Sequence, residues 1–341
     1  MHPESEIYCT GILQIRPNGA ILKPNSSGLN ARKVKQMTSS KNRSAGAKTI
    51  LAAIIGHVFW GFSFIASRTA LDRAHVFTLL SHRFLIAFIV MSLLVLFRVT
   101  KLSLRGKGRR ALLLVLLGLA EPVAYFFGEQ YGILHSTTIF SGVMIAMIPV
   151  AATLAAAVVL REKPTVLQLV FCLISIGGVV GIGLMNRSSG SIDSIGVFAL
   201  IGCVLAAVVY TLLSRGLSQE FTPFERTYMM IAVGAAVFTA LALIRAKGSI
   251  GSYLAPFSEA PYTLSVLFLS LFCSVAAYFL SSYAITHMSV ARTTVFANLT
   301  TAVSVFAGAV ILHEPFSAVG IICCVLILAG IWGVQKAARD N

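Results

Sequence analysis

Three side chains that are charged at neutral pH lie inside long apolar stretches of this sequence, where water cannot solvate a charge. Arg83 lies in the second stretch, and Glu121 and Glu129 lie in the third. A charged side chain at the centre of a bilayer costs about 2.5 to 3.5 kcal/mol on insertion scales, so each of the three requires an explanation. A buried carboxylate can exchange a proton, hold a cationic group of a ligand or pair with an arginine.

The spacing within the third stretch places both glutamates on one side of a helix. Glu121, Tyr125 and Glu129 follow one another at intervals of four residues, which align along one helical face. Arg83 has a side chain long enough to reach either carboxylate. Two interpretations stay open: a fixed ion pair that only holds the second span to the third, or a site where at least one carboxylate exchanges protons or contacts a substrate.

Aromatic and uncharged polar residues complete this candidate site. In the first stretch His57, Trp60 and Phe64 share a helical face, with Trp60 near the middle of the membrane. We interpret His57 as a neutral core histidine. The second half of the chain contributes hydroxyl, amide and aromatic groups instead of charges. We expect a substrate cavity or coupling site formed by Trp60, Phe64, Arg83, Glu121, Tyr125, Glu129, Tyr210, Tyr278, Asn298 and Thr301.

No catalytic or metal-binding pattern accompanies these residues. The sequence has no HExxH motif and no glycine-rich phosphate loop, and its three aspartates all lie in predicted loops or at the C-terminus. Five of the six cysteines lie inside apolar stretches without metal-ligand spacing, which is typical of small core residues. We therefore expect no catalytic residue, no metal, no cofactor and no enzymatic activity.

A bilayer must surround the elements that position this site. Hydrophobic residues make up 57% of the 341 residues and charged residues 11%, and the mean hydropathy is +0.86. Water-soluble domains do not have this composition. The sequence predicts an all-α integral membrane protein, because its apolar runs are long enough to cross the hydrocarbon core. Ten transmembrane helices are predicted, at 48–67, 76–98, 111–131, 138–160, 166–186, 194–214, 224–245, 262–284, 290–312 and 317–335.

Positive charge lies mainly between the apolar runs and predicts their orientation. If the N-terminus is cytoplasmic, five of the 27 Lys and Arg residues lie outside, Arg83 lies within a span, and the remaining 21 lie inside. Cytoplasmic loops carry such an excess of positive residues. We expect a multi-pass protein of the plasma (inner) membrane with both termini in the cytoplasm. The net charge of +15 is explained by these loops, and no nucleic-acid partner is expected.

The sequence also contains an internal duplication. Tyr131 and Glu162 recur 152 residues later as Tyr283 and Glu314, each at a similar place relative to the end of a span. Because five spans are an odd number, the second unit must enter the membrane with the opposite orientation, which predicts two inverted five-helix repeats. The predicted parts are a basic, disordered cytoplasmic tail at 1–47, repeats at 48–186 and 194–335, and a cytoplasmic C-terminal tail at 336–341.

Several motifs resemble those of a known family. They are Trp60-Gly61, Arg83, the run from Glu129 to Val150, "LREKPT" at 160–165 and "LHEPFS" at 312–317. Together with the repeats, they resemble the ten-helix EamA-like branch of the drug/metabolite transporter superfamily over residues 48–335. The resemblance implies a secondary transporter, commonly an exporter of amino acids, metabolites or amphipathic drugs. The chain differs from the family pattern in its long N-terminal tail and in His-Glu-Pro in place of the usual glycine-glutamate pair.

The function predicted from these observations is proton-coupled export of a small polar or amphipathic metabolite. Two inverted repeats suit this function, because they can open one central site alternately to either side. A membrane-embedded enzyme or a non-transporting scaffold is the alternative. The expected partners are a small-molecule substrate and the lipid bilayer, and a homodimer with a second copy of the chain stays open beside a monomer. Gly177 and Gly181, matched by Ala329 and Gly333, predict close helix contacts that join the halves or two subunits.

Overall fold

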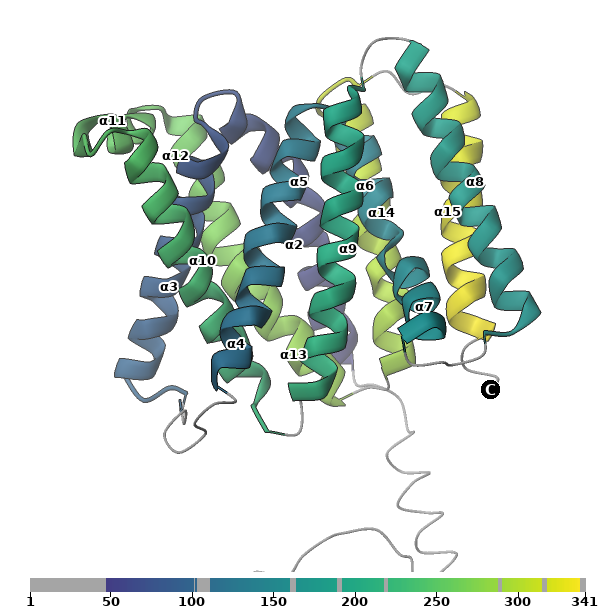
Figure 1. Ribbon diagram of the computed structural model, residues 1–341, viewed down its shortest axis with the longest axis horizontal. Coiled ribbons are helices and arrows are strands. Elements are labelled where there is room, and N and C mark those ends of the chain that lie inside the picture. Colours follow the sequence, from purple (N-terminus) through teal and green to yellow (C-terminus); the bar gives the residue numbers. More distant parts are fainter. Residues whose placement is uncertain are drawn as a thin grey trace, which may run out of the picture. The chain divides into compact units, whose positions relative to one another are not determined.

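The computed structural model describes residues 47–100, 102, 111–159, 164–188, 192–217, 220–287, 290–314 and 318–337. Every regular element in these ranges is a helix (Figure 1). In chain order they are α2 (Ala47–Leu71), α3 (Val76–Leu96), α4 (Ala111–Gly118), η2 (Leu119–Ala124), α5 (Tyr125–Leu134), α6 (Thr138–Ala146), α7 (Ile148–Val159), α8 (Val166–Ser188), α9 (Ser194–Leu217), α10 (Pro223–Arg245), α11 (Ile250–Leu254), η3 (Ala255–Ser258), α12 (Ala260–Leu267), η4 (Phe268–Ala276), α13 (Ala277–His287), α14 (Val290–Val310) and α15 (Ala318–Ala337).

The helices are those of a multi-pass membrane protein. Seven are long and apolar enough to cross a bilayer in the described ranges: Lys48–Leu71, Val76–Leu96, Leu112–Leu134, Thr138–Ala155, Ser194–Ser214, Pro223–Arg245 and Ala260–Ser281. Three shorter apolar helices are Val166–Ile182, Leu299–Val310 and Ala318–Val334. They fall in the three remaining predicted spans, but a total of ten crossings stays a prediction. Apart from Ala47, the predicted tail at 1–47 lies outside the described residues.

Three of the predicted spans are interrupted helices. In the third span, Glu121 has extended dihedrals (φ −141°, ψ 115°) within the π-helical turn η2, because Pro122 disfavours helical geometry in the residue before it. In the eighth span, η4 is also a π-helical turn, and it includes the positions 152 residues beyond η2. The fourth span is divided between α6 and α7 at Met147. Such interruptions release backbone groups from their helical partners and often mark binding sites.

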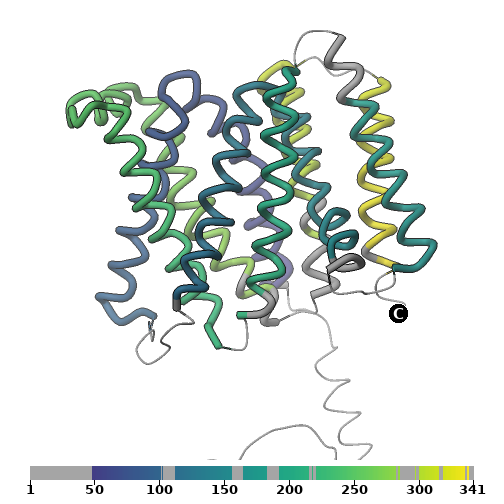
Figure 2. Tube along the Cα trace, viewed as in Figure 1, coloured from purple at the N-terminus to yellow at the C-terminus, as the bar shows by residue number. Residues whose placement is uncertain are grey.

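Helix contacts join the two predicted repeats in a reciprocal pattern. The first helix, α2, packs against α13 and α14, and its counterpart α9 packs against α5, α6 and α7. The pairs α3–α10 and α8–α15 also connect equivalent spans, and Figure 2 shows α8 beside α15 along most of their length. An exchange of the two halves would preserve these pairings, as a pseudo-two-fold axis requires. The beginning of α2 and the end of α15 lie at the same end of the helical bundle (Figure 1).

Small residues allow several of these helices to approach closely. A Cβ on Gly181 would lie 2.8 Å from the Cys323 sulfur, so the α8–α15 contact joins the halves through one of the predicted faces. Gly177 does not take part, because nothing lies within 4 Å of its Cβ position; Gly178 contacts α15 instead. The fifth span begins with a capping box, in which the backbone N–H groups of Thr165 and Gln168 each donate to the other residue's side chain, at 2.7 and 3.2 Å.

Candidate functional site

A cavity of about 360 Å³ lies between the halves of the helical bundle. Its wall contains nine of the ten residues selected from the sequence. They are Trp60, Phe64, Arg83, Glu121, Tyr125, Glu129, Tyr210, Tyr278 and Thr301. The tenth, Asn298, lies on α14, and its side chain is outside the described part of the chain. The first repeat therefore supplies the charged residues of the wall, and the second supplies hydroxyl and aromatic groups.

Arg83 and Glu129 face each other across the boundary between α3 and α5. Arg83 Nη1 lies 4.0 Å from Glu129 Oε2, and the two side chains are only 2% and 7% exposed. The carboxylate also accepts hydrogen bonds from Gln130 Nε2 at 2.9 Å and from the Tyr125 hydroxyl at 3.4 Å. The ionic contact is thus long, while neutral neighbours supply the hydrogen bonds of the carboxylate.

The guanidinium of Arg83 is held mainly by residues other than Glu129. Its Nε donates to Ser274 Oγ at 3.0 Å, and its carbon lies 4.3 Å from the centroid of the Phe126 ring. Its Nη1 is buried and has no hydrogen-bond partner among the described residues. Since a buried donor without a partner is costly, this nitrogen is suited to bind an acceptor that enters the cavity.

Glu121 has different surroundings. Its Oε1 accepts a hydrogen bond from the Tyr278 hydroxyl at 3.0 Å, a contact between the two halves of the chain. It makes no ion pair with any residue that the structure describes, although its side chain lines the cavity. The Tyr278 ring packs edge-on against Trp60, with centroids 5.4 Å apart. A carboxylate beside aromatic faces can bind a proton or a cationic group.

The interruption of the eighth span positions Trp60. The indole N–H donates to the backbone carbonyl of Cys273 at 3.0 Å, within η4. His57 lies one turn before Trp60, and its Nδ1 is 3.0 Å from Thr300 Oγ1. His57 is therefore a hydrogen-bonded, buried residue as the sequence suggested, yet it also lines the cavity.

Sequence reasoning missed several residues of the wall. Thr300, directly before the selected Thr301, and Pro149, just after the break between α6 and α7, both line the cavity. Gly142 was not selected, although a small residue in an apolar run is a signal of close packing; a Cβ there would collide with Ser304. His82, which directly precedes Arg83, does not line the cavity; its Nδ1 contacts the Tyr262 hydroxyl at 2.7 Å.

These side chains line a cavity, and the described residues include no recognisable metal centre. No three His, Cys, Asp or Glu side chains of the described ranges are placed to hold a metal ion. The cavity wall contains one guanidinium, two carboxylates, several aromatic rings and a row of apolar residues from α6 and α7. Such a wall can bind a small molecule with both polar and apolar parts, and its carboxylates can exchange protons.

The sequence matches the model of the EamA-like transporter family twice, at residues 47–184 and 194–335. The chain belongs to the EamA-like transporter family. Among relatives of this EamA-like protein, the uncharacterized transporter YcxC of Bacillus subtilis (strain 168) is 33% identical over 286 residues, 83% of this chain and 91% of that protein. An uncharacterized transporter of Archaeoglobus fulgidus is 24% identical over 82% of this chain and 95% of its own.

The family and the names of these relatives point to a transporter rather than an enzyme. The uncharacterized transporter YetK of Bacillus subtilis (strain 168) is 26% identical to this EamA-like chain and aligns with 85% of it and 87% of its own length. A solved crystal structure with 18% sequence identity has a TM-score of 0.59 and covers 87% of this chain and 99% of its own. At this identity, the likeness concerns the fold alone.

Proposed function

We propose that this EamA-like protein is a secondary transporter that exports a small polar or amphipathic metabolite in exchange for protons. The observation that carries this proposal is Glu121, a carboxylate that faces the cavity, contacts Tyr278 of the other half and has no ionic partner among the described residues. Such a group can bind a proton or a cationic substrate group, but it gains little from holding both at once. Competition of this kind couples the two fluxes.

Glu129 and Arg83 provide a second element that can change between two states. When Glu129 is ionised, it attracts Arg83 across 4.0 Å. When Glu129 is protonated, the attraction is lost and Arg83 Nη1, which lacks a hydrogen-bond partner, can bind an acceptor on the substrate. In this proposal the site takes a cationic or hydroxyl group near Glu121 and a carbonyl or anionic group near Arg83.

Alternating access by the two inverted repeats, at 48–186 and 194–335, is part of the same proposal. The reciprocal helix pairings and the π-helical turns in the third and eighth spans support it, since related halves can exchange conformations around a central site. The excess of Lys and Arg in the loops favours a plasma membrane protein with both termini in the cytoplasm. Export rather than uptake is proposed from the resemblance to the family.

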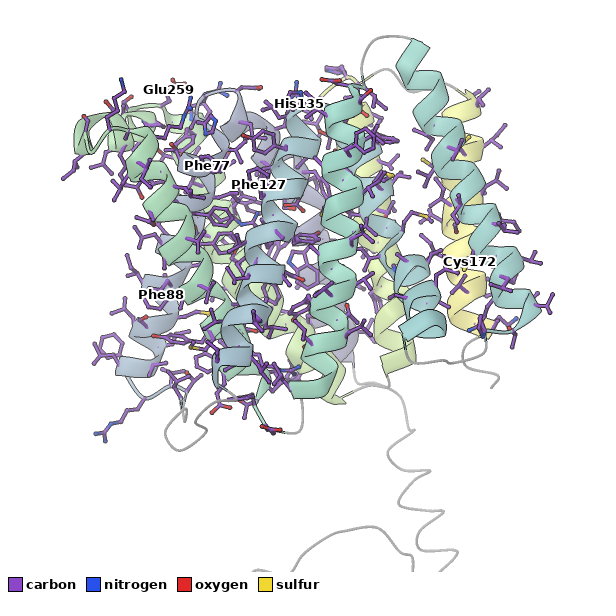
Figure 3. All side chains as sticks on the ribbon, in the orientation of Figure 1. Phe77, Phe88, Phe127, His135, Cys172 and Glu259 are labelled. Atoms are coloured by element: carbon purple, nitrogen blue, oxygen red, sulfur yellow. The ribbon has the colours of Figure 1, made fainter. Side chains whose placement is uncertain are left out.

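Contacts at the end of the bundle opposite the described termini suggest which side is closed. At this end, Glu314 accepts hydrogen bonds from the backbone N–H groups of Thr138 (2.6 Å) and Ile139 (2.9 Å), which connects the second half to the start of α6. Figure 3 labels His135 and Glu259 there. His135 lies 3.4 Å from Asp193, and Glu259 lies 3.0 Å from an arginine of the first half. In the proposed orientation, the outer side is the one that these contacts close.

The experiment begins with growth protection by overexpression against a panel of amino acids and amphipathic compounds, which provides a substrate. Purified protein in liposomes then serves to measure transport driven by a pH gradient and substrate exchange without a gradient. We expect Glu121→Gln to abolish gradient-driven transport, because neutral glutamine cannot release a proton, while exchange persists at a higher substrate concentration, because glutamine also binds a cationic group more weakly. Asp72→Asn is the matched control, since this carboxylate is 55% exposed and does not line the cavity. Gradient-driven transport at the normal rate in Glu121→Gln would refute the coupling role.

A further inference from the structure

A second cavity, of about 230 Å³, lies beside the central one. Its wall is formed by the inner part of α3, the start of α10 and the junction of η4 with α13. The lining residues are Met91, Thr222, Pro223, Phe224, Thr227, Val275, Tyr278 and Phe279. No charged residue belongs to this wall, in contrast to the central cavity with its two carboxylates and one guanidinium.

Two of the three hydroxyl groups at its margin, those of Thr222 and Tyr278, are already engaged. The side chain of Thr222 accepts a hydrogen bond from the Glu225 backbone at 3.2 Å, as part of the capping box that starts α10. The Tyr278 hydroxyl is directed away from this cavity, toward Glu121. The Phe224 and Phe279 rings stack in its wall with centroids 6.0 Å apart. Apart from the Thr227 hydroxyl, the wall is a surface of rings and apolar groups, which binds hydrocarbon better than polar groups.

Tyr278 belongs to the walls of both cavities and is the link between them. Its ring packs edge-on against Trp60 and also lines the apolar cavity. Tyr278 follows directly after the π-helical turn η4, a type of interruption that is frequent at functional sites. A molecule bound at Glu121, which accepts a hydrogen bond from the Tyr278 hydroxyl, therefore lies beside a residue of the apolar wall.

We propose that the apolar cavity is a side pocket that takes the alkyl or aryl tail of an amphipathic, cationic substrate whose head binds at Glu121. This inference rests on the proposed function and narrows its substrate class from polar metabolites to amphipathic ones. Phe279 is 36% exposed, so one wall meets the bilayer, where lipid acyl chains compete for the same space. The wall residue that it shares with the central cavity, Tyr278, favours the substrate tail as occupant.

The test uses the full chain in lipid nanodiscs and a series of primary ammonium ions from butylammonium to decylammonium. The sequence has two tryptophans, Trp60 and Trp332, so Trp332→Phe leaves the emission of Trp60, beside Tyr278, as the reporter of head-group binding. Thr227→Leu fills the pocket from α10. Ala236→Leu on the same helix is the matched control, because Ala236 is exposed and lines neither cavity.

We expect the dissociation constant to fall by up to about fourfold per methylene as the tail enters the pocket. Thr227→Leu should weaken decylammonium binding at least about tenfold, should leave butylammonium binding unchanged, and should therefore flatten the dependence on chain length. Ala236→Leu should change neither the butylammonium nor the decylammonium dissociation constant. Because the tail partitions into lipid equally in both variants, their comparison corrects for this partition. Equal decylammonium affinity in the two variants would overturn the pocket proposal and leave lipid as its occupant.

A second measurement needs no pocket-filling variant. A decylammonium probe with a diazirine at the end of its chain should label residues 222–227 or 275–279 upon illumination, and unlabelled decylammonium should suppress the labelling. Labelling only at lipid-facing positions elsewhere would overturn the proposal. The head site is tested separately by butylammonium, whose binding should be weakened by Glu121→Gln. If butylammonium fails to bind while the effect of Thr227→Leu on decylammonium persists, the proposed head-group site is wrong and the pocket stands.

Discussion

Replacement of Arg83 and Glu129 by leucine, singly and together, tests whether their contact is structural, functional or both. Two unit charges 4.0 Å apart attract each other by about 4 kcal/mol at an effective dielectric constant of about 20. Removal of one member of a buried pair costs about 3 to 5 kcal/mol, because the other charge stays buried without compensation. Arg83→Leu also loses the contacts with Ser274 and Phe126, so it should be the more destabilising single change.

The double variant should be more stable than the sum of the two single effects predicts. We expect a coupling free energy of about 3 kcal/mol, since leucines can fill the site without a buried charge. SDS-induced unfolding of the purified protein, followed by tryptophan fluorescence, measures all three variants. The control is the same cycle on Arg68 and Asp72, whose atoms lie 3.7 Å apart but whose side chains are 36% and 55% exposed. An exposed pair of this kind should give a coupling of at most about 1 kcal/mol.

Transport by the same variants separates the two roles. We expect Glu129→Gln to stop gradient-driven transport while substrate exchange continues, and the double leucine variant to fold but not to couple transport to protons. If that variant is stable and fully active, Glu129 has no coupling role and the pair only holds α3 to α5. If the single effects simply add, with a coupling below about 0.5 kcal/mol, the ion pair itself contributes nothing and the reasoning from burial is wrong.

Three further predictions concern packing, closure and orientation. Gly128→Ala should destabilise the protein by about 1 to 3 kcal/mol, because the added Cβ would lie 2.6 Å from the Ala199 carbonyl oxygen. Gly202→Ala should be tolerated, because no atom of the described residues lies within 4 Å of its Cβ position. Equal unfolding curves for the two variants would contradict this. Glu314→Gln should weaken the contact with the start of α6 that closes the outer side, and should increase labelling of single cysteines in the cavity by an impermeant reagent. Unchanged labelling would show that this contact does not help to close the outer side. A single cysteine in the loop 98–110 should resist such a reagent in intact cells, and ready labelling would reverse the proposed orientation.

Much of the site could be predicted without coordinates, because the bilayer makes its residues conspicuous. Arg83, Glu121 and Glu129 can be recognised as charged residues in apolar runs, and the spacing of four residues from Glu121 through Tyr125 to Glu129 places the two glutamates on one helical face. Nine of the ten residues selected by their polarity, aromatic character or helical spacing line one cavity. The two short helices α11 and η3 were not predicted, since elements of five and four residues are too short to show a periodicity.

The sequence by itself determined that the chain crosses a membrane several times and which residues it places in hydrocarbon. The reason is that the apolar composition and the length of each run decide whether a helix can span the hydrocarbon core. The tertiary structure alone decided which polar groups meet: Arg83 lies near Glu129, and Glu121 meets Tyr278, 157 residues away. Local spacing cannot fix such contacts. They depend on how the π-helical turns η2 and η4 rotate the halves of two distant spans toward one cavity, and no periodicity within either span encodes that mutual placement.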